Sequence, residues 1–159
     1  MTIQISRAST DDAEAISQLI QKLVHHFTVD PEGRGAEVFL KSAEVDAIRG
    51  YIAAPNFCYF VARDEDHLAG FVGVRDNAHL YHLFVDPLHQ GRGLGRQLWD
   101  QAKAWAITEG NGSGFTVNSS PNAIPVYERF GFQATGERTE MNGIAFVPMR
   151  LELVAWRAD

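Results

Sequence analysis

The chain has 159 residues, of which 45% are hydrophobic and 21% charged, and its formal net charge is −6. This length and composition are typical of a globular protein, and we expect one domain over residues 1–159. The negative charge argues against nucleic-acid and anionic-membrane partners, the apolar runs are too short to cross a bilayer, and the first residues lack a signal-peptide core, so we predict a cytoplasmic protein.

The first half of the chain predicts a strand, two helices and three further strands. Residues 4–7 read as the first strand, and a helix follows it. The apolar residues of that helix recur at helical spacing: Ile16, Leu19, Ile20, Leu23, Val24 and Phe27. A loop over 28–35 leads to a weaker second helix over about 36–50. Three alternating or apolar runs then predict an antiparallel meander, at 57–62, 68–74 and 79–85.

The second half alternates helices and strands. A helix with one apolar stripe stops at Gly110, and a strand covers 114–119. Pro121 suits the first turn of a further helix. Two strands complete the chain, at 132–137 and 145–154. The element order is therefore β-α-α-β-β-β-α-β-α-β-β, which predicts a mixed α/β sheet.

Three glycines stand at the start of the long helix, in the segment HQGRGLGRQLW at 89–99. Glycine weakens a helix, so their presence needs a compensating reason. A helix N-terminus has unpaired N–H groups and a partial positive charge, and glycines let an anion approach its backbone. Arg92 and Arg96 add positive charge there. The spacing of the glycines does not match the dinucleotide-binding pattern in either register, which disfavours an NAD-dependent oxidoreductase. The Gly-Lys-Ser/Thr sequence of nucleotide-triphosphate loops is also absent.

Two segments carry a resemblance to a known family. VDPLHQGRGLG, at 85–95, resembles the Val-x-Pro-x-x-(Gln/Arg)-Gly-x-Gly-(Leu/Ile)-Gly signature of the GNAT superfamily of acyl-CoA-dependent N-acyltransferases. NSSPNAIPVYERFGF, at 118–132, is similar to the second signature of that family, with Ala123, Tyr127, Gly131 and Phe132 at the matching positions. The resemblance implies the GNAT fold, in which two central strands splay and leave a slot for acyl-CoA.

The resemblance also implies how this chain would hold acetyl-CoA as the acyl donor. Backbone amides of the glycine segment would bind the pyrophosphate, from Gln90, Gly91, Arg92, Gly93, Leu94, Gly95 and Arg96. The main chain of three strand residues would pair with the pantetheine arm and supply an N–H for the carbonyl oxygen: Leu83, Phe84 and Val85. Either Asn118 or Ser120 would make a further contact, since the family often has Asn where this chain has Ser120.

Two kinds of residue are candidates for catalysis. By its place in the family motif, Tyr127 would protonate the departing thiolate, because a phenol stays protonated at neutral pH. His82 or His79 could accept the proton of the amine. Strand alternation predicts that His82 lies on one face with Leu80 and Phe84, and His79 on the other with Tyr81 and Leu83. The two histidines would then point apart, so we predict no metal site.

The resemblance implies an N-acetyltransferase that moves the acetyl group directly to a primary amine of a small molecule or peptide. The alternative is a non-catalytic acyl-CoA-binding sensor or regulatory module of the same fold. The loop over 28–35 would line the acceptor pocket, where the carboxylates of Asp30, Glu32 and Glu37 could attract a cationic amine. The alternative, which the composition favours, is an acidic loop that is simply solvated. The family is also compatible with a homodimer.

Overall fold

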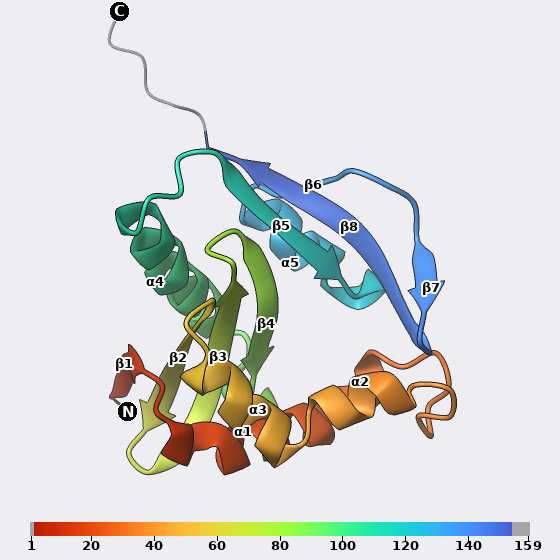
Figure 1. Ribbon diagram of the computed structural model, residues 1–159, viewed down its shortest axis with the longest axis horizontal. Helices are drawn as coiled ribbons and strands as arrows, with labels where there is room; N and C mark the ends of the chain where they lie inside the picture. The colour runs from red at the N-terminus through yellow and green to blue at the C-terminus, as the bar shows by residue number, and fades with distance from the viewer. Residues whose placement is uncertain (1, 154–159) are drawn as a thin grey trace, which may run out of the picture.

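A computed structural model describes residues 2–153, which form an eight-stranded sheet with helices on both faces (Figure 1). The strands are β1 Ile3–Arg7, β2 Phe57–Asp64, β3 His67–Arg75, β4 His79–Val85, β5 Gly114–Ser119, β6 Gln133–Ala134, β7 Thr139–Met141 and β8 Ile144–Glu152. The helices are α1 Ala13–Leu23, α2 Glu37–Ser42, α3 Val45–Ala53, α4 Leu94–Thr108 and α5 Ile124–Arg129.

The sheet has the order β1-β2-β3-β4-β5-β8-β6, and β7 also pairs with β8. The β4–β5 pair is parallel and the other pairs are antiparallel. The mixed α/β sheet is therefore confirmed. The last predicted strand ran to Val154, which lies outside the described residues. Within residues 2–153, no helix is long and apolar enough to cross a membrane.

Two predicted elements divide differently in the structure. The helix predicted over 36–50 is two helices, because Glu44 between them has an extended backbone with φ −70° and ψ 158°. Near the C-terminus, β7 and β8 form a hairpin around Asn142 and Gly143, whose φ angles are 53° and 75°. An Asn-Gly pair with two positive φ angles is the usual signal of a tight hairpin turn, so the sequence itself carries the signal for this hairpin.

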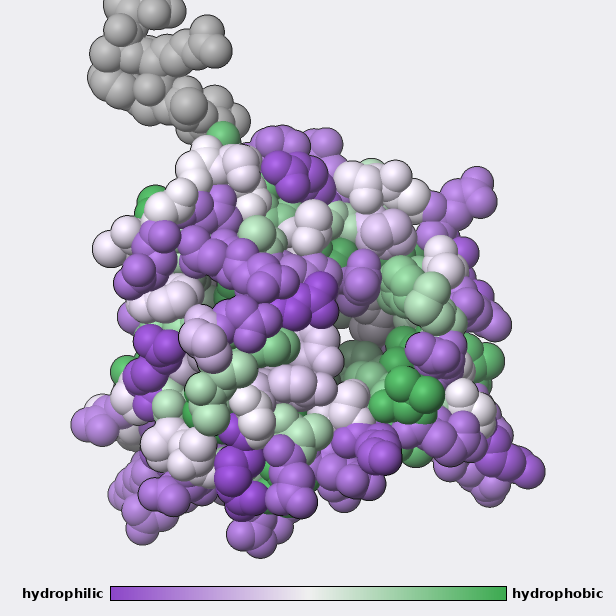
Figure 2. Space-filling model, viewed as in Figure 1, coloured by the Kyte–Doolittle hydropathy of each residue, from purple (hydrophilic) through white to green (hydrophobic). Residues whose placement is uncertain are grey.

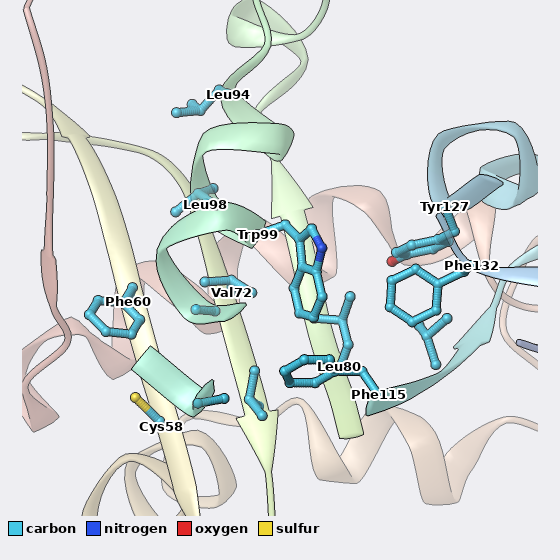
Figure 3. Packing of buried hydrophobic residues seen from close by; sticks show 14 of the residues in the cluster. Cys58, Phe60, Val72, Leu80, Leu94, Leu98, Trp99, Phe115, Tyr127 and Phe132 are labelled. Atoms are coloured by element: carbon cyan, nitrogen blue, oxygen red, sulfur yellow. The ribbon is translucent and has the colours of Figure 1, made fainter. Parts of the chain in front are cut away.

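Each face of the sheet has its own hydrophobic core. On one face, α4 and α5 cover a cluster centred on Trp99, which is 1% exposed and meets Phe115 edge to face at 4.9 Å between ring centroids (Figure 3). On the other face, α1 and α3 cover a cluster that contains Ile16, Ile48 and Phe71. Deleting a buried aromatic side chain costs about 3–5 kcal/mol, so these clusters hold the helices in place.

An irregularity in β4 changes which way its side chains point. Gly73 pairs with His82 but Val74 pairs with Leu80, so Tyr81 has no partner on β3. One extra residue reverses the alternation beyond it. Leu80 accordingly packs in the cluster under α4, whereas the Tyr81 and His82 rings lie together, with centroids 4.3 Å apart. The prediction that His82 shares a face with Leu80 is therefore wrong.

The centre of the sheet opens between β4 and β5. These strands pair only at His79 with Thr116 and at Leu80 with Val117. Beyond that point they diverge (Figure 1), so the edge of β4 from Leu83 to Val85 has no strand beside it. The predicted splay of the two central strands is confirmed.

Candidate active site

The opening between β4 and β5 contains a cavity of about 660 Å³. The space-filling view shows a hollow there with hydrophobic surface beside it (Figure 2). Most of the residues that the sequence singled out line this cavity: His82, Leu83, Phe84, Val85, Gln90, Gly91, Gly93, Leu94, Gly95, Arg96, Asn118, Ser120 and Tyr127. Arg92 does not, and instead lines a smaller cavity with Ile3, His89, Leu94 and Gln97.

The glycine segment forms a tight turn that presents backbone amides. Gly91 and Gly93 have φ angles of 79° and 78°, and a Cβ built on either would meet no atom within 4 Å. Glycine is therefore required there by backbone conformation, not by crowding. The first backbone hydrogen bond of α4 joins Gln97 N–H to Gly93 O at 3.1 Å. The amides of Leu94, Gly95 and Arg96 precede it and have no acceptor within the helix, as at any helix N-terminus.

Positive charge collects at this end of the cavity. Arg96 and Arg129 both line it, in a chain of net charge −6. The Arg96 guanidinium donates to Arg129 O at 3.1 Å and lies 5.4 Å from the centroid of the Phe130 ring. Its Nε also lies 3.5 Å from Asp100 Oδ1, and the side chain stays 53% exposed. The end formed by residues 90–96 can thus bind an anion through both its backbone and its charge.

The edge of β4 presents its backbone groups to the cavity in a defined pattern. Asp86 N–H donates to Ala69 O at 2.8 Å, and hydrogen-bonded pairs alternate along an antiparallel ladder. With the register of β3 and β4, this places the Phe84 backbone groups toward β3. The groups of Leu83 and Val85 therefore point toward the cavity. One of them, Val85 O, accepts a hydrogen bond from the Gln90 side-chain amide at 3.0 Å.

Tyr127 extends from α5 to the wall of the cavity. Its ring is 8% exposed and meets Phe130 and Phe132 edge to face (Figure 3). Burial raises the pKa of its phenol, so the hydroxyl stays protonated at neutral pH. Among residues 2–153 the hydroxyl has no hydrogen-bond partner, although it lines the cavity. It is therefore a neutral donor available to a molecule in the cavity.

The two histidines of β4 lie in different surroundings. His82 is 6% exposed, its Nδ1 lies 2.9 Å from the Tyr59 hydroxyl, and burial lowers its pKa to about 3. His79 is outside the cavity lining, and its Nδ1 lies 2.8 Å from Thr116 Oγ1. Burial, together with the positive charge of Arg75, lowers the pKa of His79 to about 4. Both imidazoles are thus neutral at physiological pH, and only His82 borders the cavity.

The two polar candidates on the far wall differ in exposure. Asn118, at the end of β5, is exposed, whereas Ser120 is 9% exposed. Asn118 pairs with Pro148 of β8. Both side chains line the cavity opposite β4, so both stay candidates for a contact with a bound molecule.

The end of the cavity away from the glycine turn is mostly apolar, and its residues were not predicted from the sequence. They come from α1 and the residues just after it, from α2 and from β8, and His26 is the polar member of the set: Leu23, His26, Phe27, Phe39, Ile144, Ala145 and Phe146. A hydrogen bond of 2.8 Å from Val29 N–H to Gly143 O fastens the loop over 28–35 to the β7–β8 turn. Only the spatial meeting of three distant segments creates this wall, so no local pattern predicted it.

The three acidic residues predicted to attract an amine lie elsewhere. Asp30 and Glu32 pair with Arg34 at 2.8 Å and 3.1 Å, and Glu37 accepts from Gly35 N–H at 3.1 Å. None of the three lines the cavity, and no Asp or Glu is among the described residues that do. An ammonium group would find no carboxylate at this wall.

Comparisons with known proteins agree with this geometry. Residues 21–153 match the family model described as the acetyltransferase (GNAT) domain. Human N-acetyltransferase 8B is 26% identical over 118 residues, which cover 67% of this chain and 52% of that protein. The matched part of the chain thus spans about half the length of this relative, and less than half the length of the other two curated relatives.

Two solved structures show how widely the fold agrees. The PaiA N-acetyltransferase from Thermoplasma acidophilum, in complex with coenzyme A, superposes with a TM-score of 0.76 at 17% identity, covering 96% of this chain and 99% of that one. YncA from Salmonella typhimurium, a putative acetyltransferase with its cofactor acetyl-CoA, gives a TM-score of 0.74 at 19% identity, covering 100% and 98%. At these identities the likeness concerns the fold.

Proposed function

The chain belongs to the GNAT acetyltransferase family, and from this premise we propose that it transfers the acetyl group of acetyl-CoA directly to a primary amine of a small molecule or peptide. One observation carries the proposal. An amide-rich turn, an open strand edge and a buried phenol, from three different segments, border a single cavity. Binding, positioning and proton transfer could then take place in one continuous space.

The walls of the cavity fit the parts of acetyl-CoA in order. The turn over 90–96, with Arg96 and Arg129, suits a pyrophosphate. The backbone groups of Leu83 and Val85 suit the amides of a pantetheine arm, which would pair with β4 as a short extra strand. Asn118 or Ser120 would contact the arm from the opposite wall.

The chemical step needs a donor for the carbonyl oxygen and an acid for the leaving thiolate. We assign the first role to the Val85 or Leu83 N–H, since the Phe84 N–H is directed to β3. We assign the second role to the Tyr127 hydroxyl, which gives its proton to the leaving thiolate and regains the proton that the attacking amine loses. Because burial raises the pKa of the phenol, the two transfers must be coupled. Neutral His82 borders the same space and could take the proton lost by the amine, although burial leaves it a weak base.

The apolar wall narrows the class of acceptor. It combines three phenylalanines with aliphatic side chains and has no carboxylate among the described lining residues: Leu23, Phe27, Phe39, Ile144, Ala145 and Phe146. Such a wall favours a bulky apolar group next to the amine and gives no charge stabilisation to an ammonium ion. We therefore propose an acceptor whose amine is attached to an aromatic or aliphatic body.

The test is thiol release from acetyl-CoA across a panel of amines matched in pKa and graded in apolar bulk. The expected result is turnover that rises with bulk, together with an acetylated product of the right mass. Tyr127→Phe should lose most of this turnover, and Tyr51→Phe is its matched control, because Tyr51 does not line the cavity. Coenzyme A binding without turnover on any amine or peptide would instead favour a non-catalytic acyl-CoA-binding module. The cytoplasmic location and the homodimer stay predictions.

A further inference from the structure

A second group of polar side chains lies beside the glycine turn, and one of its members, His89, also lines the main cavity. The group consists of His67 at the start of β3, Asp86 after β4, and His89 just before the turn. One potential ligand atom from each lies within 4.8 Å of the other two. Asp86 is 3% exposed and His89 is 5% exposed, whereas the His67 side chain is 53% exposed. Two of the three side chains are therefore buried, and solvent reaches the group at His67.

The hydrogen bonds of this group leave one buried nitrogen unexplained. His89 Nε2 lies 3.2 Å from Asp64 Oδ2. His89 Nδ1 is buried and has no hydrogen-bond partner among the described residues. An unpaired polar atom of this kind costs about 1–3 kcal/mol. Asp64 would hold the Nε2 proton, and Nδ1 then keeps the free lone pair that a metal ion requires.

The aspartate of the group is suited to the same role. Asp86 Oδ1 accepts the Leu88 N–H at 2.9 Å, which fixes the carboxylate. Its Oδ2 lies 3.1 Å from His67 Nε2 and 3.4 Å from Lys22 Nζ.

We propose that His67, Asp86 and His89 bind a divalent transition-metal ion, with Zn²⁺ as the preferred ion, and that Asp64 orients His89 as an outer-shell carboxylate. Two imidazoles and one carboxylate, with water in the fourth position, are a ligand set that zinc accepts. Bonds of about 2.0–2.1 Å place tetrahedral ligands roughly 3.3 Å apart, so the exposed His67 must move inward and Lys22 must leave Asp86. The ion would tie the start of β3 to the residues that precede the cofactor turn.

The sequence predicted no metal site, because the two histidines of β4 were expected to point apart and no local spacing connects His67 with His89. His67 and His89 are 22 residues apart in the sequence, and they meet only because β3 and β4 are neighbours. Their rings lie 5.5 Å apart with an interplanar angle of 23°.

The experiment is a Zn²⁺ titration of the whole chain, prepared without a histidine tag and stripped with a chelator, followed by calorimetry and by Co²⁺ absorption spectra. We expect one ion per chain, a tetrahedral Co²⁺ spectrum, and a rise in melting temperature on binding. His67→Ala should weaken binding at least about tenfold, and Asp64→Asn about 10–100-fold. Lys22→Gln should tighten binding, because it removes the competing ammonium group.

The control is His25→Ala, which removes an exposed histidine from a different part of the molecule and should change nothing. No Zn²⁺ uptake by the folded chain would overturn the proposal, and so would uptake that His67→Ala leaves intact. Circular dichroism of each variant shows whether it is folded. None of these readouts depends on acetyl transfer, so the result stands whether or not the proposed function holds.

Discussion

The two ends of the cavity are built in opposite ways. At the glycine turn, one contiguous segment supplies amides, positive charge and a helix start, all within residues 90–96. At the other end, α1 and α2 contribute one apolar side chain each, Phe27 adds a third, and the start of β8 supplies the rest. A backbone hydrogen bond between Val29 and Gly143 joins two of these segments. The first end has the features of a site for a phosphate group that many enzymes share. The second end can change by single substitutions without disturbing the first.

The largest expected effect is a loss of coenzyme A affinity when one residue of the glycine turn is replaced. Gly93→Glu places a carboxylate before the amides of α4, and like-charge contacts cost several kcal/mol, so coenzyme A affinity should fall about 1,000-fold. Gly35→Glu is the matched control, because Gly35 has a φ of 85° and, like Gly93, open space around its Cβ position. Calorimetry should show nearly unchanged affinity for Gly35→Glu. Equal losses in both variants would mean that backbone strain, and not the anion site, was measured.

A change at the middle of the cavity should affect chemistry without affecting binding. Tyr127→Phe removes the proposed acid and keeps the ring in its cluster, so we expect kcat to fall about 100-fold with coenzyme A affinity unchanged. Steady-state kinetics and calorimetry together separate the two effects. Full turnover in Tyr127→Phe would contradict the assignment of the leaving-group acid.

The buried His82 predicts how stability depends on pH. Its pKa is lowered to about 3 in the folded chain, whereas an unfolded histidine titrates at 6.5. Between these values the unfolded state binds the extra proton, so stability falls as the pH is lowered from 7 toward 3. His82 alone should contribute a loss of about 2 kcal/mol between pH 7 and pH 5. Urea unfolding of wild type and His82→Gln at both pH values measures this loss. An equal loss of unfolding free energy between pH 7 and pH 5 in the two proteins would refute the assignment.

The smallest expected effect concerns the apolar wall. Phe39→Ser removes an aromatic contact worth about 1–2 kcal/mol, so the KM for a bulky apolar amine should rise about tenfold, while coenzyme A affinity stays the same. Val38→Ser is the control, since Val38 is 65% exposed on the same helix and does not line the cavity. A KM that stays at the wild-type value in Phe39→Ser would remove the case for an apolar acceptor.

The difference between the two ends also explains what the sequence could predict. The glycine turn and the Tyr127 motif are local patterns, and local patterns also gave β4 and β5 with their observed bounds. The prediction of side-chain direction along β4 was wrong beyond Tyr81, because a bulge depends on pairing with β3 and cannot be recognised in the sequence of the strand itself. The apolar wall and the His67–Asp86–His89 group depend on segments that meet only after folding, so composition and spacing could not reveal them.

The hydrogen bond between the Gln90 side chain and Val85 O has a consequence for ligand exchange. An amide of an arriving pantetheine arm would compete with the Gln90 side chain for the Val85 carbonyl, and where it takes the place of Gln90 one bond replaces another of similar strength. The exchange adds little binding free energy, and it favours molecules that carry an amide at this position, because these restore the hydrogen bond to Val85 O. In the proposed function, Gln90 would therefore compete with the pantetheine arm for this carbonyl, which would favour release of coenzyme A after the transfer.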